Sequence, residues 1–127
     1  MKCVIEKVDQ PCDAGREMKI RLRTDLRRAM KDGSPAETML IRALIAALDN
    51  AEAPPIQVDQ KMTDQHRFSD RSAETERLRL SAVQVRAILT TEAREREAAA
   101  AEMVRLNRPD RADALRTEAL IARRYME

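Results

Sequence analysis

The chain has 127 residues, of which 43% are hydrophobic and 36% are charged, and its net charge is +2. This length favours a single domain, and so small a net charge does not favour disorder. One Phe, one Tyr and no Trp are present, which excludes a sheet that stacks RNA bases on aromatic rings. No apolar run reaches the roughly 18 residues that span a bilayer. We expect no membrane partner.

The composition favours helices, because Ala, Leu, Arg and Glu are abundant and only two Gly are present. We therefore predict an all-α protein, a bundle of four main helices with an antiparallel C-terminal helical hairpin and a long polar linker between its second and third helices. The N-terminus has no apolar signal region, so we expect a cytoplasmic location.

Few residue types that carry out catalysis are available. Cys3 and Cys12 have neither a redox nor a zinc-ligand spacing, which favours free thiols over a disulfide or redox pair. His66 is the only histidine, and one histidine cannot hold zinc. Gly15 and Gly33 are too far apart to form a phosphate-binding loop. We predict no catalytic residues, no metal site and no cofactor.

Residues 1–17 show no helical periodicity, and we interpret them as a loosely ordered leader, with a single helical domain over 18–127. A first helix is predicted over Met18–Lys31, because Leu22, Leu26 and Met30 recur at helical spacing and Gly33 can end it in a left-handed conformation.

This first helix carries most of the positive charge. It contains six basic residues and one acid, and four of the cations form a row at i, i+4 spacing: Lys19, Arg23, Arg27 and Lys31. Like charges at this spacing repel by a few tenths of a kcal/mol, roughly, per pair. Either acidic side chains elsewhere in the fold balance the row, or an anionic partner such as RNA does.

The second helix begins with Ser34, Pro35 and Glu37, the pattern of a capping box with proline in the first turn. Between Met39 and Leu48 only Arg42 is charged, so we predict a central helix with neighbours on several sides. Residues 50–79 are polar and contain two adjacent prolines, and we interpret them as a flexible linker in which 72–79 have weak helical character.

Two further helices are predicted at the C-terminal end. Ser81 and Gln84 form a capping-box pattern for a helix that runs to about Leu106, and Asn107 can adopt the left-handed conformation that ends it. Pro109 then opens the last helix. The turn between them is short, which predicts an antiparallel hairpin.

Two segments resemble the GatB/YqeY family. The first, LRTDLRRAMKDGSPAETMLIRALIAALDNAEA, has the family's basic amphipathic helix, glycine turn and apolar helix. The second, LSAVQVRAILTTEAREREAAAAEMVRLNRPDRADALRTEALIARRY, is similar to its capped helix, Arg-rich stretch and Ala/Glu-rich last helix. The chain departs from the family at Glu97, Met103 and Asn107, where Arg, an aromatic residue and Gly are usual. It also stops at Glu127, where members continue into a second small domain, so the resemblance is to a compact form.

The resemblance implies kinship with the C-terminal helical region of the B subunit of aspartyl/glutamyl-tRNA amidotransferase, which helps to hold tRNA while the chemistry occurs elsewhere. The family label also implies a carbon–nitrogen ligase that uses glutamine as amido donor, although this sequence shows no residues for it.

These observations support three functional hypotheses, of which the first two are the stronger. In the first, the chain is a non-catalytic module that binds tRNA or other RNA through Lys19, Arg23, Arg27 and Lys31, with Arg94 and Arg96 extending the patch. In the second, it is a protein-interaction or oligomerisation module that meets an acidic protein or a second copy. An amidotransferase activity is a third and weaker hypothesis.

Overall fold

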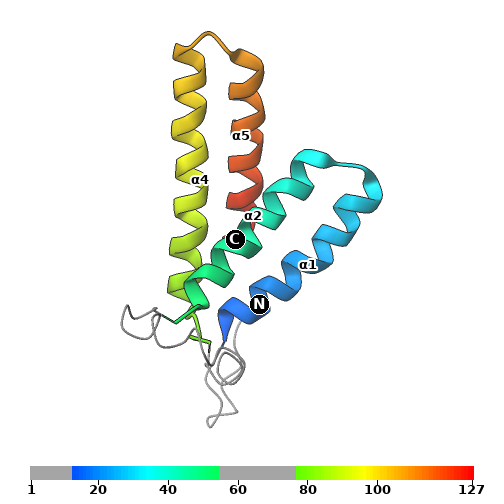
Figure 1. Cartoon of the computed structure of the whole chain (residues 1–127), viewed down its shortest axis with the longest axis vertical. Helices are drawn as coiled ribbons and strands as arrows, with labels where there is room; N and C mark the ends of the chain where they lie inside the picture. The colour runs from blue at the N-terminus through cyan, green and yellow to red at the C-terminus, as the bar shows by residue number, and fades with distance from the viewer. Residues whose placement is uncertain (1–12, 55–76) are drawn as a thin grey trace, which may run out of the picture.

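The computed structural model describes residues 13–54 and 77–127, and these residues form four α-helices with no strands among them. The helices are α1 (Ala14–Asp32), α2 (Pro35–Glu52), α4 (Ala82–Arg105) and α5 (Pro109–Arg124). Figure 1 shows two antiparallel hairpins, one of α1 and α2 and one of α4 and α5, with the first leaning against the base of the second. The all-α prediction and the C-terminal hairpin are confirmed.

The main core lies where the two hairpins meet. Leucines dominate it, because helices rich in Leu and Ala present continuous apolar stripes at a spacing of three or four residues. Its fully buried large side chains are Leu22, Leu40, Ile41, Leu44, Leu48 and Leu89. Helix α2 contacts α1, α4 and α5, as expected of a central helix, although Met39 near its start is 68% exposed.

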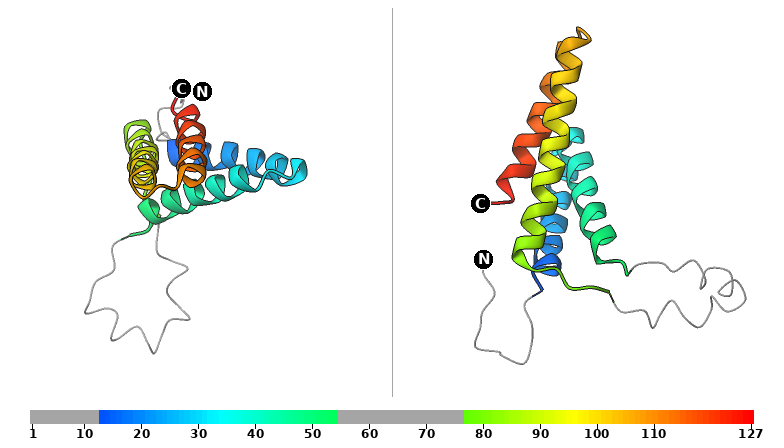
Figure 2. Two further views of the ribbon diagram at one scale, coloured as in Figure 1. Left: turned by 90° about the horizontal axis from the view of Figure 1, so that it is seen from above. Right: turned by 90° about the vertical axis from the view of Figure 1, so that its left-hand side faces the viewer.

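The far half of the α4–α5 hairpin extends beyond this core (Figure 2). It has a small core of its own, formed by Ala100, Ala112 and Leu115. Alanines there allow the two helix backbones to approach closely. Asn107 has φ 64°, so it makes the predicted left-handed turn between the helices.

Helix α1 begins at Ala14, one turn before the predicted start at Met18. Asp13 caps it, since its Oδ1 accepts a hydrogen bond of 3.1 Å from the backbone N–H of Arg16. Residues 14–17 therefore belong to a helix and not to a leader. Gly33 ends α1 with φ 71°, as predicted.

The helix starts differ in how they are capped. At α4 the Ser81 hydroxyl accepts from Gln84 N–H at 3.2 Å and the Gln84 side chain accepts from Ser81 N–H at 2.8 Å, so this capping box is confirmed. At α2 the Ser34 side chain makes no capping hydrogen bond, so the box predicted there is wrong. Pro35 in the first turn, which has no N–H to satisfy, starts α2 without it.

Parts of the predicted linker are ordered. Helix α2 continues to Glu52, and Leu78 N–H donates to the Glu52 carbonyl at 2.8 Å. The Leu80 carbonyl accepts from Ala14 N–H at 3.1 Å, and the Leu80 side chain is buried. Residues 77–79 are not helical, and the rest of the predicted segment 72–79 lies outside the described residues.

The two serine caps give a matched test of this fold. We expect Ser81→Ala to lower the free energy of unfolding by about 1 kcal/mol, because the first-turn N–H loses its acceptor. Ser34→Ala should cost clearly less, because its hydroxyl accepts no such bond. Urea unfolding followed by circular dichroism measures the free energy of unfolding of both variants. Equal decreases in the two would contradict the conclusion that Ser81 caps its helix through its side chain and Ser34 does not.

Candidate nucleic-acid interface

The orientation of α1 decides which of its cations face solvent. Leu22 and Ala29 are fully buried, and Gly15 is buried against the segment before α4, so these residues mark the inward side of the helix. A row at i, i+4 spacing turns by about 40° at each step of a helix with 3.6 residues per turn. The predicted row from Lys19 to Lys31 therefore winds through roughly 120° around the helix, and its Lys19 end turns toward the inward side.

Lys19, the first member of the predicted row, is buried, with an exposed fraction of 8%. Its Nζ lies 2.7 Å from Oδ1 of Asp49 and 2.6 Å from Oε1 of Glu52. Burial alone would lower the pKa of Lys19, but the hydrogen bonds and charges of the two carboxylates outweigh it and raise the pKa above 10.5. The expectation that Lys19 faces an RNA phosphate is corrected: acidic side chains of the same fold balance it.

Arg77 completes this group, which we call the Lys19 clamp (Lys19, Asp49, Glu52 and Arg77). Its Nε lies 3.4 Å from Oε1 of Glu52, and its Nη2 donates to the Asp49 carbonyl at 3.2 Å. The clamp thus joins the start of α1, the end of α2 and the segment before α4. Gly15 leaves room for the clamp, because a Cβ there would lie 2.8 Å from Oε2 of Glu52 and would displace this carboxylate.

Six cations of α1 are exposed, and four of them share one side of the helix. We call these four the α1 cation strip: Arg16, Arg23, Arg27 and Lys31. Spacings of seven and four residues place them on one side of the helix. At 1.5 Å per residue they span roughly 22 Å. Within residues 13–54 and 77–127, no carboxylate forms an ion pair with any of them.

A further guanidinium lies beside the strip. Arg42 of α2 reaches across to α1, where its Nη2 is 3.7 Å from Sδ of Met30. Met30 follows Arg27 by three residues, so Arg42 adds charge near the end of the strip. Arg28 differs, because it lies 3.5 Å from Oδ1 of Asp25, one turn away on α1.

The two predicted cations of α4 are separated from each other. Arg96 has only 17% of its side chain exposed, and it bridges the hairpin by contacting Glu92 at 2.8 Å and Glu118 of α5 at 3.2 Å. It serves the packing of α4 on α5, so the prediction that it extends an outward patch is corrected. Arg94 is exposed and lies near Glu97, whose pKa is lowered chiefly by its hydrogen bond to Arg123.

Sequence reasoning missed Arg16, because residues 1–17 show no helical periodicity and the sequence therefore predicts a leader there. The signal was present, since Asp13 three residues before Arg16 is a good N-cap. The Lys19 clamp had no comparable signal. Its partners lie 30 and 33 residues further along the chain, at a distance that only tertiary packing sets.

A second anchor fixes the other end of the interface between the hairpins. Tyr125 is buried, and its hydroxyl donates to Oδ2 of Asp25 at 2.5 Å. The Arg21 guanidinium lies 4.7 Å above the ring centroid. Burial and the Asp25 carboxylate raise the pKa of Tyr125 well above its usual value near 10, so the phenol stays protonated and donates.

Metal binding and membrane crossing concern the same part of the chain, the residues that the structure describes. No group of three or more His, Cys, Asp and Glu side chains is arranged to hold a metal ion there. None of the described helices combines the length and the apolar character needed to cross a bilayer. The predictions for Cys3, Cys12 and His66 concern residues outside the described ranges.

Comparison with protein-family profiles, with curated proteins and with solved structures finds no match.

The Lys19 clamp predicts a large effect of one substitution. Lys19→Met should lower the free energy of unfolding by about 2–4 kcal/mol, because it leaves the buried Glu52 carboxylate with a weaker partner. Arg23→Met, four residues away on the exposed side, should change stability by less than about 0.5 kcal/mol. Urea unfolding of both variants measures the difference, and similar small losses in the two would show that the clamp contributes nothing.

Proposed function

We propose that this chain is a non-catalytic helical module that binds the phosphate backbone of RNA through the α1 cation strip. The observation that carries the proposal is the run of four exposed cations without an ion-paired carboxylate among the described residues. The resemblance to the GatB/YqeY family makes tRNA the first RNA to test and suggests a role accessory to tRNA-dependent amidotransferases that use glutamine.

The electrostatics of the strip support a polyanionic ligand. Arg23, Arg27 and Lys31 repel one another at i, i+4 spacing, and this repulsion disfavours the free state by a few tenths of a kcal/mol, roughly, per pair. Phosphates along a nucleic acid would neutralise these charges and release condensed counterions, which favours binding at low salt.

The same residues predict little sequence preference. Sequence is read from base edges or by stacking on aromatic rings, whereas Arg and Lys on phosphates only position the ligand. Tyr125 is the only tyrosine, and its ring is buried beneath Arg21 with its hydroxyl engaged by Asp25. Contacts to phosphates, without base readout, are therefore what this surface offers.

A second candidate function is docking on an acidic protein or on another copy. The observation that favours it is a pair of exposed methionines at the tip of the α1–α2 hairpin, Met30 (52%) and Met39 (68%). Exposed methionines adapt to apolar partner surfaces, and Lys31 and Arg42 beside them would suit carboxylates.

Removal of two strip cations tests the RNA proposal. Arg23→Ala with Arg27→Ala should weaken tRNA retention on a filter at low salt by about tenfold or more. For the unmodified chain, four phosphate contacts predict that log Kobs falls against log salt with a slope of about −3. The control is Arg105→Ala with Arg116→Ala, which removes the same charge from exposed residues of α4 and α5 and should leave retention nearly unchanged.

Retention that is the same in both double variants, or that does not change between low and moderate salt, would rule the proposal out. A different pair of results would support the second candidate. The unmodified chain would retain no RNA but would capture an acidic protein, and the double variant Met30→Ser, Met39→Ser would no longer capture it.

A further inference from the structure

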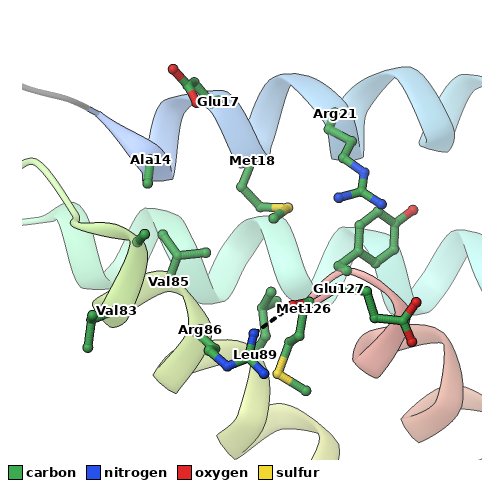
Figure 3. Close-up of a pocket in the computed structure, with 12 residues that line it drawn as sticks. Ala14, Glu17, Met18, Arg21, Val83, Val85, Arg86, Leu89, Met126 and Glu127 are labelled. Carbon is green, nitrogen blue, oxygen red and sulfur yellow. Dashed lines mark hydrogen bonds between the residues drawn. The ribbon is translucent and has the colours of Figure 1, made fainter. Parts of the chain in front are cut away.

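A groove of about 390 Å³ lies where the start of α1, the first turns of α4 and the C-terminal end of the chain meet. Figure 3 shows Met18 of α1, Val85 and Leu89 of α4, and Met126 gathered around it. Met18 and Met126 are half-buried, whereas Val85 and Leu89 are almost fully covered. The groove therefore offers an apolar floor that is open to solvent.

Charges at the edge of the groove are balanced. Glu17 and Arg21 lie on the α1 side, and Arg86 and Glu127 lie on the other side. Arg86 is held in place, because its Nη1 donates to the Met126 carbonyl at 2.6 Å. An occupant that suits this groove has apolar side chains and no large net charge.

We propose that the groove is the docking site of this chain's own N-terminal segment, residues 1–12, with Val4, Ile5 and Val8 seated on the apolar floor. The segment has the required chemistry. Its apolar residues are interspersed with two lysines and two acids, so its side chains carry no net charge, like the edge of the groove. The charged residues are Lys2, Glu6, Lys7 and Asp9.

The place where the segment joins the fold supports this occupant. Residue 12 is followed by Asp13, which caps α1, and then by Ala14, which itself lines the groove. Along α1 the groove extends from Ala14 to Arg21, roughly 10 Å at 1.5 Å per residue. Val8 is five residues from Asp13 and can reach about 17 Å, and Val4 can reach about 30 Å. The chain between Asp13 and each of the three apolar residues is therefore long enough for all three side chains to reach the floor of the groove.

Covalent attachment also favours this occupant over a separate molecule. A short tether gives an effective concentration in the millimolar range, so a contact too weak to hold a free peptide is populated within one chain. This inference stands independently of RNA binding, because it uses none of the α1 cation strip.

Methionine oxidation in the full-length protein tests the proposal, because Met18 and Met126 line the groove while Met39 is exposed elsewhere. The variant Val4→Ser, Ile5→Ser, Val8→Ser removes the apolar anchors. We expect hydrogen peroxide to oxidise Met18 and Met126 about threefold faster or more in this variant, with the Met39 rate unchanged, as followed by peptide mass spectrometry.

The matched control is Lys7→Ser, Asp9→Ser, Gln10→Ser, which changes three residues of the same segment and keeps its apolar side chains and its zero net side-chain charge. It should oxidise like the unmodified chain. Both variants retain Cys3 and Cys12, so thiol oxidation is the same in each. Unchanged rates at Met18 and Met126 in the apolar variant would overturn the proposal.

A photocrosslinking group in place of Val8 gives a second measurement. It leaves the core residues of the four helices unchanged, so its result does not depend on how stable a core variant is. Crosslinks within one chain to Met18, Leu89 or Met126, in a yield independent of protein concentration, are expected. Crosslinks between two chains that rise with concentration would assign the groove to a second copy, and crosslinks to neither would leave it to another partner. Both results would overturn the proposal.

Discussion

The ammonium group of Lys19, held between the carboxylates of Asp49 and Glu52, is the interaction on which the rest of the structure depends. A buried charge is costly unless it is paired and hydrogen-bonded, so these contacts fix the rotation of α1 about its axis. Once that rotation is set, Leu22 and Ala29 face the core and the remaining cations face solvent. The surface proposed to bind RNA is thus a consequence of a contact made on another side of the same helix.

The two hairpins are held together at both ends of their interface. At one end, Leu80 accepts hydrogen bonds from the start of α1, and at the other, Tyr125 donates to Asp25. Between them lies a core of leucines that includes Leu44 and Leu89. These contacts hold α1 against the C-terminal hairpin, and they also form the groove proposed to receive residues 1–12.

Much of the fold could be predicted because its signals are local. The Ser81–Gln84 capping box, the left-handed turn at Asn107 and the apolar stripes each involve residues within one or two helical turns. The candidate site could be predicted only in part. The sequence predicts that Lys19 and Arg96 are exposed, but Lys19 meets Glu52, 33 residues along the chain, and Arg96 meets Glu118 of another helix. A single sequence gives no register for such contacts.

The account is tested most directly by a map of the residues that crosslink to tRNA, recorded by ultraviolet irradiation and mass spectrometry over a series of salt concentrations. The account predicts crosslinked peptides from residues 16–31 and the adjoining part of α2, with yields that fall together as salt rises. Crosslinks concentrated on α4 and α5, or yields on residues 16–31 that are insensitive to salt, would contradict it.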